Sequence, residues 1–263
     1  MTESKFNIAV LIDGDNAQAK LIKEIIEEVS KYGKVTIRRI YGDWTTQHMN
    51  SWKEIINQYS FSPIQKFAYT SGKNSTDSSL IIDAMDILHH KSVEGFCIVS
   101  SDSDYTGLAK RIREEGLFVM GIGRKITPIA FVNSCEIFTY SENLLVETTP
   151  VKAKEKKTTS TAKKVSKKTD KATEKSTDKA TETTNSFQKI DIKLIDKAFD
   201  ISANDDEGAY ISKIGLSLRK IDPSFDPRTY GFKTLTQLFS NIDKYIIIKN
   251  EVNGLNHPLV KLK

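Results

Sequence analysis

Apolar residues in the first half of the chain follow two patterns that alternate. Short, mainly apolar runs, typical of strands buried in a sheet, occupy residues 7–13, 35–43, 62–70, 95–102 and 117–123, with a shorter run at 136–140. Apolar residues recur at helical spacing at 17–32, 51–59, 78–90 and 107–115. Ser75 or Thr76 is expected to cap the third of these helices. The alternation predicts an α/β domain, with an open and mostly parallel sheet and helices on both faces.

The end of the chain has a different order of elements. Helical spacing at 191–201, 209–221 and 234–242 is followed by strand-like runs at 244–250 and 257–263. Pro223 and Pro227 break the chain between the second and third helices. Three helices and a terminal β-hairpin predict a small winged helix-turn-helix domain.

A stretch of Lys, Thr, Ser, Ala and Glu separates the two patterned regions. Residues 151–186 contain eleven lysines and five acidic residues, whereas the whole chain has a net charge of only +5, so the remainder is close to neutral. A segment with so few apolar residues cannot bury enough surface to offset the entropy of ordering it. We therefore expect a disordered basic linker at 147–186, between an N-terminal domain at 5–146 and a C-terminal domain at 187–263.

The composition excludes several classes of protein. No run approaches the roughly 18 consecutive apolar residues of a membrane-spanning helix, so no membrane association is expected. The two cysteines, Cys97 and Cys135, lie in apolar surroundings, and their spacing suits neither a disulfide framework nor a zinc site. We interpret them as buried free thiols of a reducing compartment and expect a cytoplasmic protein.

Acidic residues stand where the first and fourth predicted strands end. Asp13 closes the first run, where a charge has no packing role, and Asp102 and Asp104 follow the fourth. Asp77 lies in the first turn of the helix after the third strand. Because the carboxyl ends of parallel strands line one crevice, these four side chains are expected to converge there. Asp15 is equally well explained as a turn residue.

Such a cluster predicts a metal site. Carboxylates held close together repel one another, and a divalent cation removes that penalty. Oxygen ligands suit Mg²⁺ or Mn²⁺, which activate water and stabilise the leaving oxygen of a phosphodiester. No Ser-His-Asp or Cys-His combination stands in matching positions. Asp83 and Asp86 lie about 120° and 180° around the helix from Asp77, so they are expected to face solvent or pair with neighbours.

Three motifs in the N-terminal region resemble the NYN domain of the PIN-like superfamily. They are LIDGDN at 11–16, Lys-x-x-x-Asp at 73–77 and VSSDSDY at 99–105. The spacing at 73–77 is one residue longer than the usual pattern, and Tyr105 stands where the family has Phe. The resemblance implies Mg²⁺- or Mn²⁺-dependent cleavage of RNA, with Asn16 and Lys73 contacting the substrate. The metal-binding and catalytic residues that it implies are Asp13, Asp77, Asp102 and Asp104.

The C-terminal region, over about residues 187–263, resembles the OST-HTH, or LOTUS, domain, most closely at DPRTYGFKTLTQLF. The resemblance implies a winged helix that binds RNA, although some members bind protein partners instead. Tyr210 and Tyr230 are candidates for stacking on bases, Phe232 is expected in the core, and Gly231 indicates a tight turn. The residues expected to contact phosphates are Lys213, Arg219, Lys220, Arg228 and Lys233.

These observations favour a metal-dependent ribonuclease whose C-terminal domain and linker hold the RNA. The alternative is a non-catalytic adaptor or regulator that binds RNA or a protein partner. The sequence leaves open single-stranded DNA as a substrate, endo- or exonucleolytic cutting, and activity as a homodimer.

Overall fold

The computed structural model describes residues 6–67, 75–145, 187–203, 208–252 and 255–263. The predicted linker at 147–186 and the candidate substrate contact Lys73 therefore lie outside the described residues.

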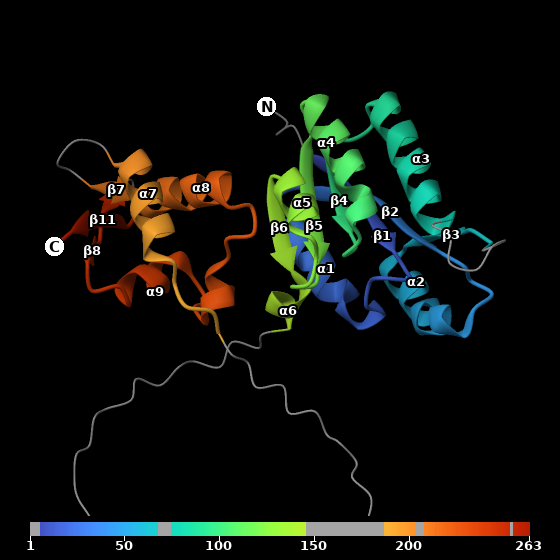
Figure 1. Ribbon diagram of the computed structural model, residues 1–263, viewed down its shortest axis with the longest axis horizontal. Helices are drawn as coiled ribbons and strands as arrows, with labels where there is room; N and C mark the ends of the chain where they lie inside the picture. Colours follow the sequence, from blue (N-terminus) through green and yellow to red (C-terminus); the bar gives the residue numbers. More distant parts are fainter. Residues whose placement is uncertain (1–5, 68–74, 146–186, 204–207, 253–254) are drawn as a thin grey trace, which may run out of the picture.

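The N-terminal domain is built on a six-stranded sheet in the order β3-β2-β1-β4-β5-β6, in which every neighbouring pair is parallel (Figure 1). The interior strands β1 and β4 are almost wholly buried, which explains why their sequences are continuous apolar runs. The strands span Asn7–Asp13 (β1), Lys34–Gly42 (β2), Ser62–Gln65 (β3), Gly95–Val99 (β4), Phe118–Gly123 (β5) and Ile137–Tyr140 (β6).

Helices cover both faces of this sheet, as the alternating pattern predicted (Figure 1). Residues of α1 and the η2–α2 segment, including Trp52, pack on one face, and residues of α3, α4 and α5 pack on the other. The helices span Ile22–Ser30 (α1), Lys53–Tyr59 (α2), Ser75–His90 (α3), Thr106–Glu114 (α4), Ile129–Ser134 (α5) and Ser141–Leu144 (α6). Short 3₁₀ turns span Ala19–Leu21 (η1), Gln47–Trp52 (η2) and Ser103–Tyr105 (η3).

Two details differ from the sequence prediction. The third long helix, α3, already includes Ser75 and Thr76, so the expectation that one of them caps it was wrong. The short helices α5 and α6 were not predicted, because six and four residues are too few to show a periodic pattern. Cys97 and Cys135 are both buried and unpaired, as expected. Of the helices in the described ranges, none combines the length and apolar character that a membrane crossing requires.

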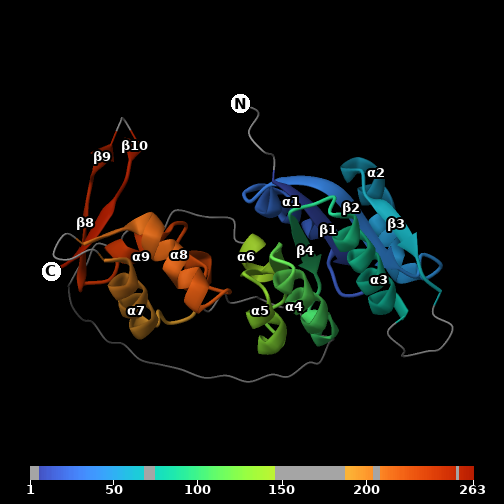
Figure 2. The ribbon, with the colours of Figure 1, turned by 90° about the horizontal axis from the view of Figure 1, so that it is seen from above.

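The C-terminal domain has three helices and a three-stranded antiparallel sheet in the order β7-β11-β8. Asp191 and Thr234 cap α7 and α9 through their side chains, and Gly231 adopts φ 86°, the left-handed turn expected there. The elements span Ile192–Ser202 (α7), Ala209–Tyr210 (β7), Ile211–Ile221 (α8), Pro227–Tyr230 (η4), Leu235–Ser240 (α9), Tyr245–Ile248 (β8) and Leu259–Leu262 (β11). Strands Glu251–Val252 (β9) and Leu255–Asn256 (β10) extend the β8–β11 hairpin (Figure 2).

The C-terminal domain lies beside the β6 edge of the large sheet and contacts it (Figure 1). The Phe138 N–H on this edge strand donates to the Pro223 carbonyl at 2.8 Å, and Asn143 Nδ2 donates to Thr229 Oγ1 at 2.8 Å. The Arg228 guanidinium makes two hydrogen bonds of 2.9 and 3.0 Å to the carboxylate of Glu28 on α1. The C-terminal domain thus shields an edge that would otherwise expose unpaired backbone groups.

Candidate metal centre

The carboxyl ends of β1 and β4 lie side by side at the centre of the large sheet, where the strand order reverses. In open parallel sheets this switch point opens a crevice in which ligands bind. Asp13 is the last residue of β1, and the loop after β4 leads into η3 with Asp102 as its N-cap. The segment Ser75–His90 brings Asp77 to the same edge from the first turn of α3.

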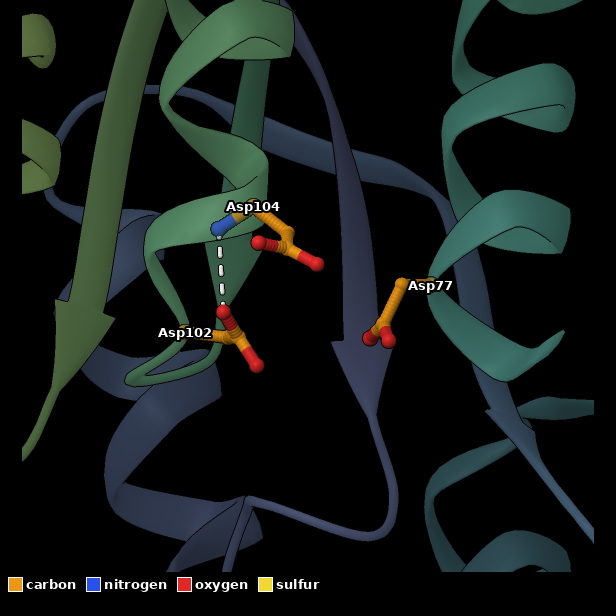
Figure 3. Close-up of side chains that lie close together, drawn as sticks. All are labelled: Asp77, Asp102 and Asp104. Atoms are coloured by element: carbon orange, nitrogen blue, oxygen red, sulfur yellow. Dashed lines mark hydrogen bonds between the residues drawn. The ribbon is translucent and has the colours of Figure 1, made fainter. Parts of the chain in front are cut away.

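Three of the expected carboxylates form a compact group. One oxygen from each of Asp77, Asp102 and Asp104 can be chosen so that all three lie within 4.8 Å of one another. Figure 3 shows Asp77 on α3 on one side of the β1 strand end, with Asp102 and Asp104 on the other side. The backbone N–H of Asp104 donates to Asp102 Oδ1 at 2.9 Å, so the cap of η3 fixes the Asp102 carboxylate relative to the Asp104 backbone.

Asp13 does not belong to this group of three and is held differently. Its side chain is buried, with 1% of its surface exposed. One carboxylate oxygen accepts hydrogen bonds from Asn16 Nδ2 at 2.7 Å and from Ser100 Oγ at 2.9 Å. Ser100 Oγ also accepts the backbone N–H of Asp102 at 3.1 Å, so Asp13 is connected to the loop of the compact group through one hydroxyl.

Two of these carboxyls have raised pKa values. Burial raises the pKa of Asp13 above its usual 3.8, against the opposing hydrogen bonds of Asn16 and Ser100. Burial also raises the pKa of Asp77, and the negative charges of Asp102 and Asp104 add to the effect. Both residues therefore disfavour their own ionised form, which is the electrostatic condition that a bound cation relieves.

Tyr105 is a contact that the sequence interpretation missed. Its ring is fully buried, and its hydroxyl donates to Asp77 Oδ1 at 2.6 Å, which lowers the pKa of Asp77. Burial, together with the charge of Asp13, raises the pKa of Tyr105 itself, so the hydroxyl remains a hydrogen-bond donor. The signal was present in the sequence, because a tyrosine stands where the motif usually has phenylalanine.

The donor set suits a hard divalent cation. All three residues of the compact group offer carboxylate oxygens, and no His or Cys of the described chain joins them. Oxygen-only sites favour Mg²⁺ or Mn²⁺ over metals that prefer nitrogen or sulfur. The residues present therefore fit the metal that the sequence predicted.

The neighbouring acidic residues have other partners. Asp15 accepts a hydrogen bond from Thr76 Oγ1 at 3.2 Å, which ties the loop after β1 to the start of α3. Asp83 pairs with Arg39 and accepts the hydroxyl of Tyr41, so the expected pairing with neighbours is confirmed. Asp86 is exposed on α3, as expected.

The basic residues expected to contact RNA have unequal surroundings. Lys213, Lys220 and Lys233 are exposed, whereas only 20% of the Arg228 side chain is accessible. Arg228 pairs with both Glu28 and Asp226, and these hydrogen bonds raise its pKa although burial opposes the charge. This pairing favours a structural role for Arg228 over a phosphate contact.

The two candidate base-stacking tyrosines lie in the C-terminal domain. Tyr210 is partly buried, and its hydroxyl accepts a hydrogen bond from Asn250 Nδ2 at 3.3 Å. Tyr230 packs against the domain core, with its ring 5.8 Å from that of Phe225. Phe232 also packs against this core, as expected.

A parallel sheet with an acidic crevice at its switch point, joined to a second domain of helices and a small sheet, defines a PIN-like α/β protein. Residues 7–142 match the NYN domain, and the chain belongs to this family. Residues 182–257 match the OST-HTH/LOTUS domain. No curated protein matches the chain. A protein of unknown function from Vibrio parahaemolyticus has a similar solved structure, with 18% identity, a TM-score of 0.45, and coverage of 53% of this chain and 95% of that one.

We expect Asp13→Asn to raise thermal stability when a chelator is present. Burial raises the pKa of Asp13 above 3.8, so folding favours the protonated carboxyl. The protonated carboxyl of Asp13 contributes fully to stability below pH 3.8. This contribution is lost as the pH rises through the higher pKa that Asp13 has in the folded state. Asparagine stays neutral, and its amide oxygen can still accept the hydrogen bonds of Asn16 and Ser100. It loses the long 3.2 Å hydrogen bond from the Asp15 backbone N–H to the other carboxylate oxygen. The melting-temperature difference from wild type should therefore grow as the pH rises above 3.8, and a pH-independent difference would contradict this explanation.

Proposed function

We propose that this protein is a metal-dependent ribonuclease that hydrolyses RNA phosphodiester bonds at the acidic crevice of its NYN domain. The observation that carries the proposal is the convergence of Asp77 on α3 with Asp102 and Asp104 at η3, three residues that offer oxygens within 4.8 Å of one another. NYN domains are typically ribonucleases, and the OST-HTH/LOTUS match suggests RNA as the bound nucleic acid.

Each acidic residue has a proposed role. Asp77, Asp102 and Asp104 would hold Mg²⁺ or Mn²⁺. When bound, such a cation supplies Lewis-acid activation of water and stabilisation of the charge that develops on the phosphate. Asp13 is proposed as a fourth catalytic carboxylate. It also accepts a hydrogen bond from Ser100 Oγ, which in turn accepts the backbone N–H of Asp102. Tyr105 orients Asp77 by donating to one of its oxygens.

The remaining polar groups of the crevice orient the reactants in this proposal. Asn16 Nδ2 donates to the Asp13 carboxylate, and this hydrogen bond fixes the orientation of the Asn16 side-chain amide in the loop after β1. Its carbonyl oxygen remains available for a substrate hydroxyl or a water molecule. Exposed Lys213, Lys220 and Lys233 would attract the RNA backbone by their charge.

The direct test is cleavage of a labelled single-stranded RNA by the purified protein. Mn²⁺ or Mg²⁺ should support cleavage, EDTA should abolish it, and excess Mn²⁺ should restore it, because the carboxylates need a cation to act together. Labels at the 5′ and 3′ ends of the same RNA distinguish endo- from exonucleolytic cutting, and a DNA of the same sequence tests sugar preference. Cleavage that persists in EDTA would contradict the metal proposal, and binding without cleavage in any divalent cation would favour the adaptor function.

A further inference from the structure

The helix α8, which carries several of the expected RNA contacts, faces the nuclease domain. The Arg219 guanidinium lies over the ring of Tyr32, 5.6 Å from its centroid. Two hollows of about 570 and 420 Å³ open at this junction, and both are lined by Tyr32, Leu216 and Arg219. We call these two adjoining hollows the junction groove.

The junction groove has an excess of positive charge that both domains supply. Its acidic residues are Glu28, Glu136 and Asp226, and two of these, Glu28 and Asp226, are balanced by the charges of Arg228 and Lys31 together. Its basic residues are Lys31, Arg113, Arg219, Lys220, Arg228 and Lys233.

Four of the basic residues are available to a ligand. Lys31 pairs with Glu28, and Arg228 is occupied. Within the described ranges, the Arg113 guanidinium makes two long hydrogen bonds, of 3.3 Å, to backbone carbonyls. No acidic partner lies within ion-pair distance of Arg113, Arg219, Lys220 or Lys233 in the part of the chain that the structure describes.

Apolar surface lies beside these cations. Leu216, in the wall shared by the two hollows, has 61% of its surface exposed, and Ile221 and Pro223 continue the lining. Cations next to exposed apolar groups match the chemistry of single-stranded RNA, which presents phosphates on one side and unpaired bases on the other.

We propose that the junction groove binds a segment of single-stranded RNA, with phosphates contacting Arg113 of the nuclease domain and Arg219, Lys220 and Lys233 of the C-terminal domain. The RNA site is therefore composite, and neither domain completes it alone. This inference rests on the proposed ribonuclease function and deepens it, because it states where the substrate is held away from the reacting phosphate.

The position of the groove has a consequence for substrate length. Tyr32 precedes β2 and Phe118 begins β5, so the groove lies at the amino edge of the sheet, whereas the metal centre lies at the carboxyl edge. The five to seven residues of β4 and β1 separate these edges by roughly 17–23 Å at about 3.3 Å per residue. Only a long RNA can occupy both places, so a short RNA is cut without using the groove.

The test measures binding of a fluorescently labelled single-stranded RNA of about 20 nucleotides to the full chain, in EDTA, at several salt concentrations. Arg113→Gln and Arg219→Gln should each weaken binding roughly 5-fold near 0.1 M salt, because each lost phosphate contact lowers the log–log salt slope by about 0.7. Arg113→Lys should retain most of the affinity, since the charge is kept.

Matched controls come from the same domains. Arg111→Gln removes a charge from the same helix as Arg113, but Arg111 is paired with Glu114 and Glu115. Lys197→Gln removes an exposed lysine of α7. Both variants should bind RNA like the wild type, and all variants should share its melting temperature.

The outcomes separate this inference from the proposed function. Wild-type affinity in Arg113→Gln would overturn the composite site, even if Lys220→Gln weakens binding. No RNA binding by the wild type at low salt would also overturn it and would favour a protein occupant. Weakened binding of long RNA, with unchanged Mn²⁺-dependent cleavage of a short RNA, supports both proposals. Groove-dependent binding with no cleavage of any RNA supports the groove while removing the catalytic proposal.

Discussion

Asp102→Asn is expected to lower Mn²⁺-dependent RNA cleavage by at least about 10²-fold while the protein stays folded. The change removes one of three carboxylates that converge on the proposed cation, and a metal's Lewis-acid contribution of several kcal/mol corresponds to two or more factors of ten in rate. The amide oxygen of asparagine can still accept the Asp104 N–H, so the cap of η3 is preserved.

The measurement is the initial rate of cleavage at saturating Mn²⁺, together with a melting curve for each variant. Asp86→Asn is the matched control, because it removes an exposed carboxylate of α3, the helix that also carries Asp77. The control should cleave RNA at the wild-type rate. Cleavage by Asp102→Asn within a few-fold of wild type would show that the acidic group is not the catalytic centre.

Much of the fold could be predicted because its signals are local. Strands β1 and β4 are buried on both faces, so they are continuous apolar runs that end where the sheet ends. The longer helices have one apolar face and therefore show helical periodicity. Helices α5 and α6 lack this signal because they are shorter than two turns.

The candidate site could be predicted only as far as topology determines it. The ends of parallel strands place Asp13 and Asp102 at the same edge of the sheet. The distances between their side chains depend on hydrogen bonds that the apolar pattern of the sequence does not specify. Ser100 and Asn16 hold Asp13, and Tyr105 holds Asp77. These hydrogen bonds explain why Asp13 is separate from the compact group of three.

The domain junction had no sequence signal at all. Glu28 and Arg228 are 200 residues apart, Glu28 on helix α1 and Arg228 in the short turn η4. Charge alone suggested a phosphate contact for Arg228. Its burial against Glu28 and Asp226 depends on how the two domains pack, which neither periodicity nor motif spacing specifies.

Arg228→Met is expected to separate the two domains. The Glu28 carboxylate is almost fully buried, and after the change only Lys31 would remain to neutralise it. Removing one partner of a buried ion pair costs about 3–5 kcal/mol, because the other charge stays desolvated. Of the contacts that remain at the junction, the hydrogen bonds from Phe138 to Pro223 and from Asn143 to Thr229 contribute about 1 kcal/mol each. The Arg219 guanidinium over Tyr32 contributes about 0.5–1 kcal/mol. The docked arrangement should therefore lose most of its population.

Small-angle scattering should show a larger radius of gyration for Arg228→Met than for the wild type. RNA binding should weaken as well, and adding Arg113→Gln to this variant should have little further effect, because the composite groove no longer exists. The double variant Glu28→Met, Arg228→Met is the informative control. It removes the ion pair that crosses the junction and leaves two apolar side chains of similar length. Asp226 loses its Arg228 partner in both variants, so the comparison isolates the effect of Glu28, and docking should recover in part. Wild-type scattering for Arg228→Met, with an undiminished effect of Arg113→Gln on RNA binding, would show that this ion pair does not hold the domains together.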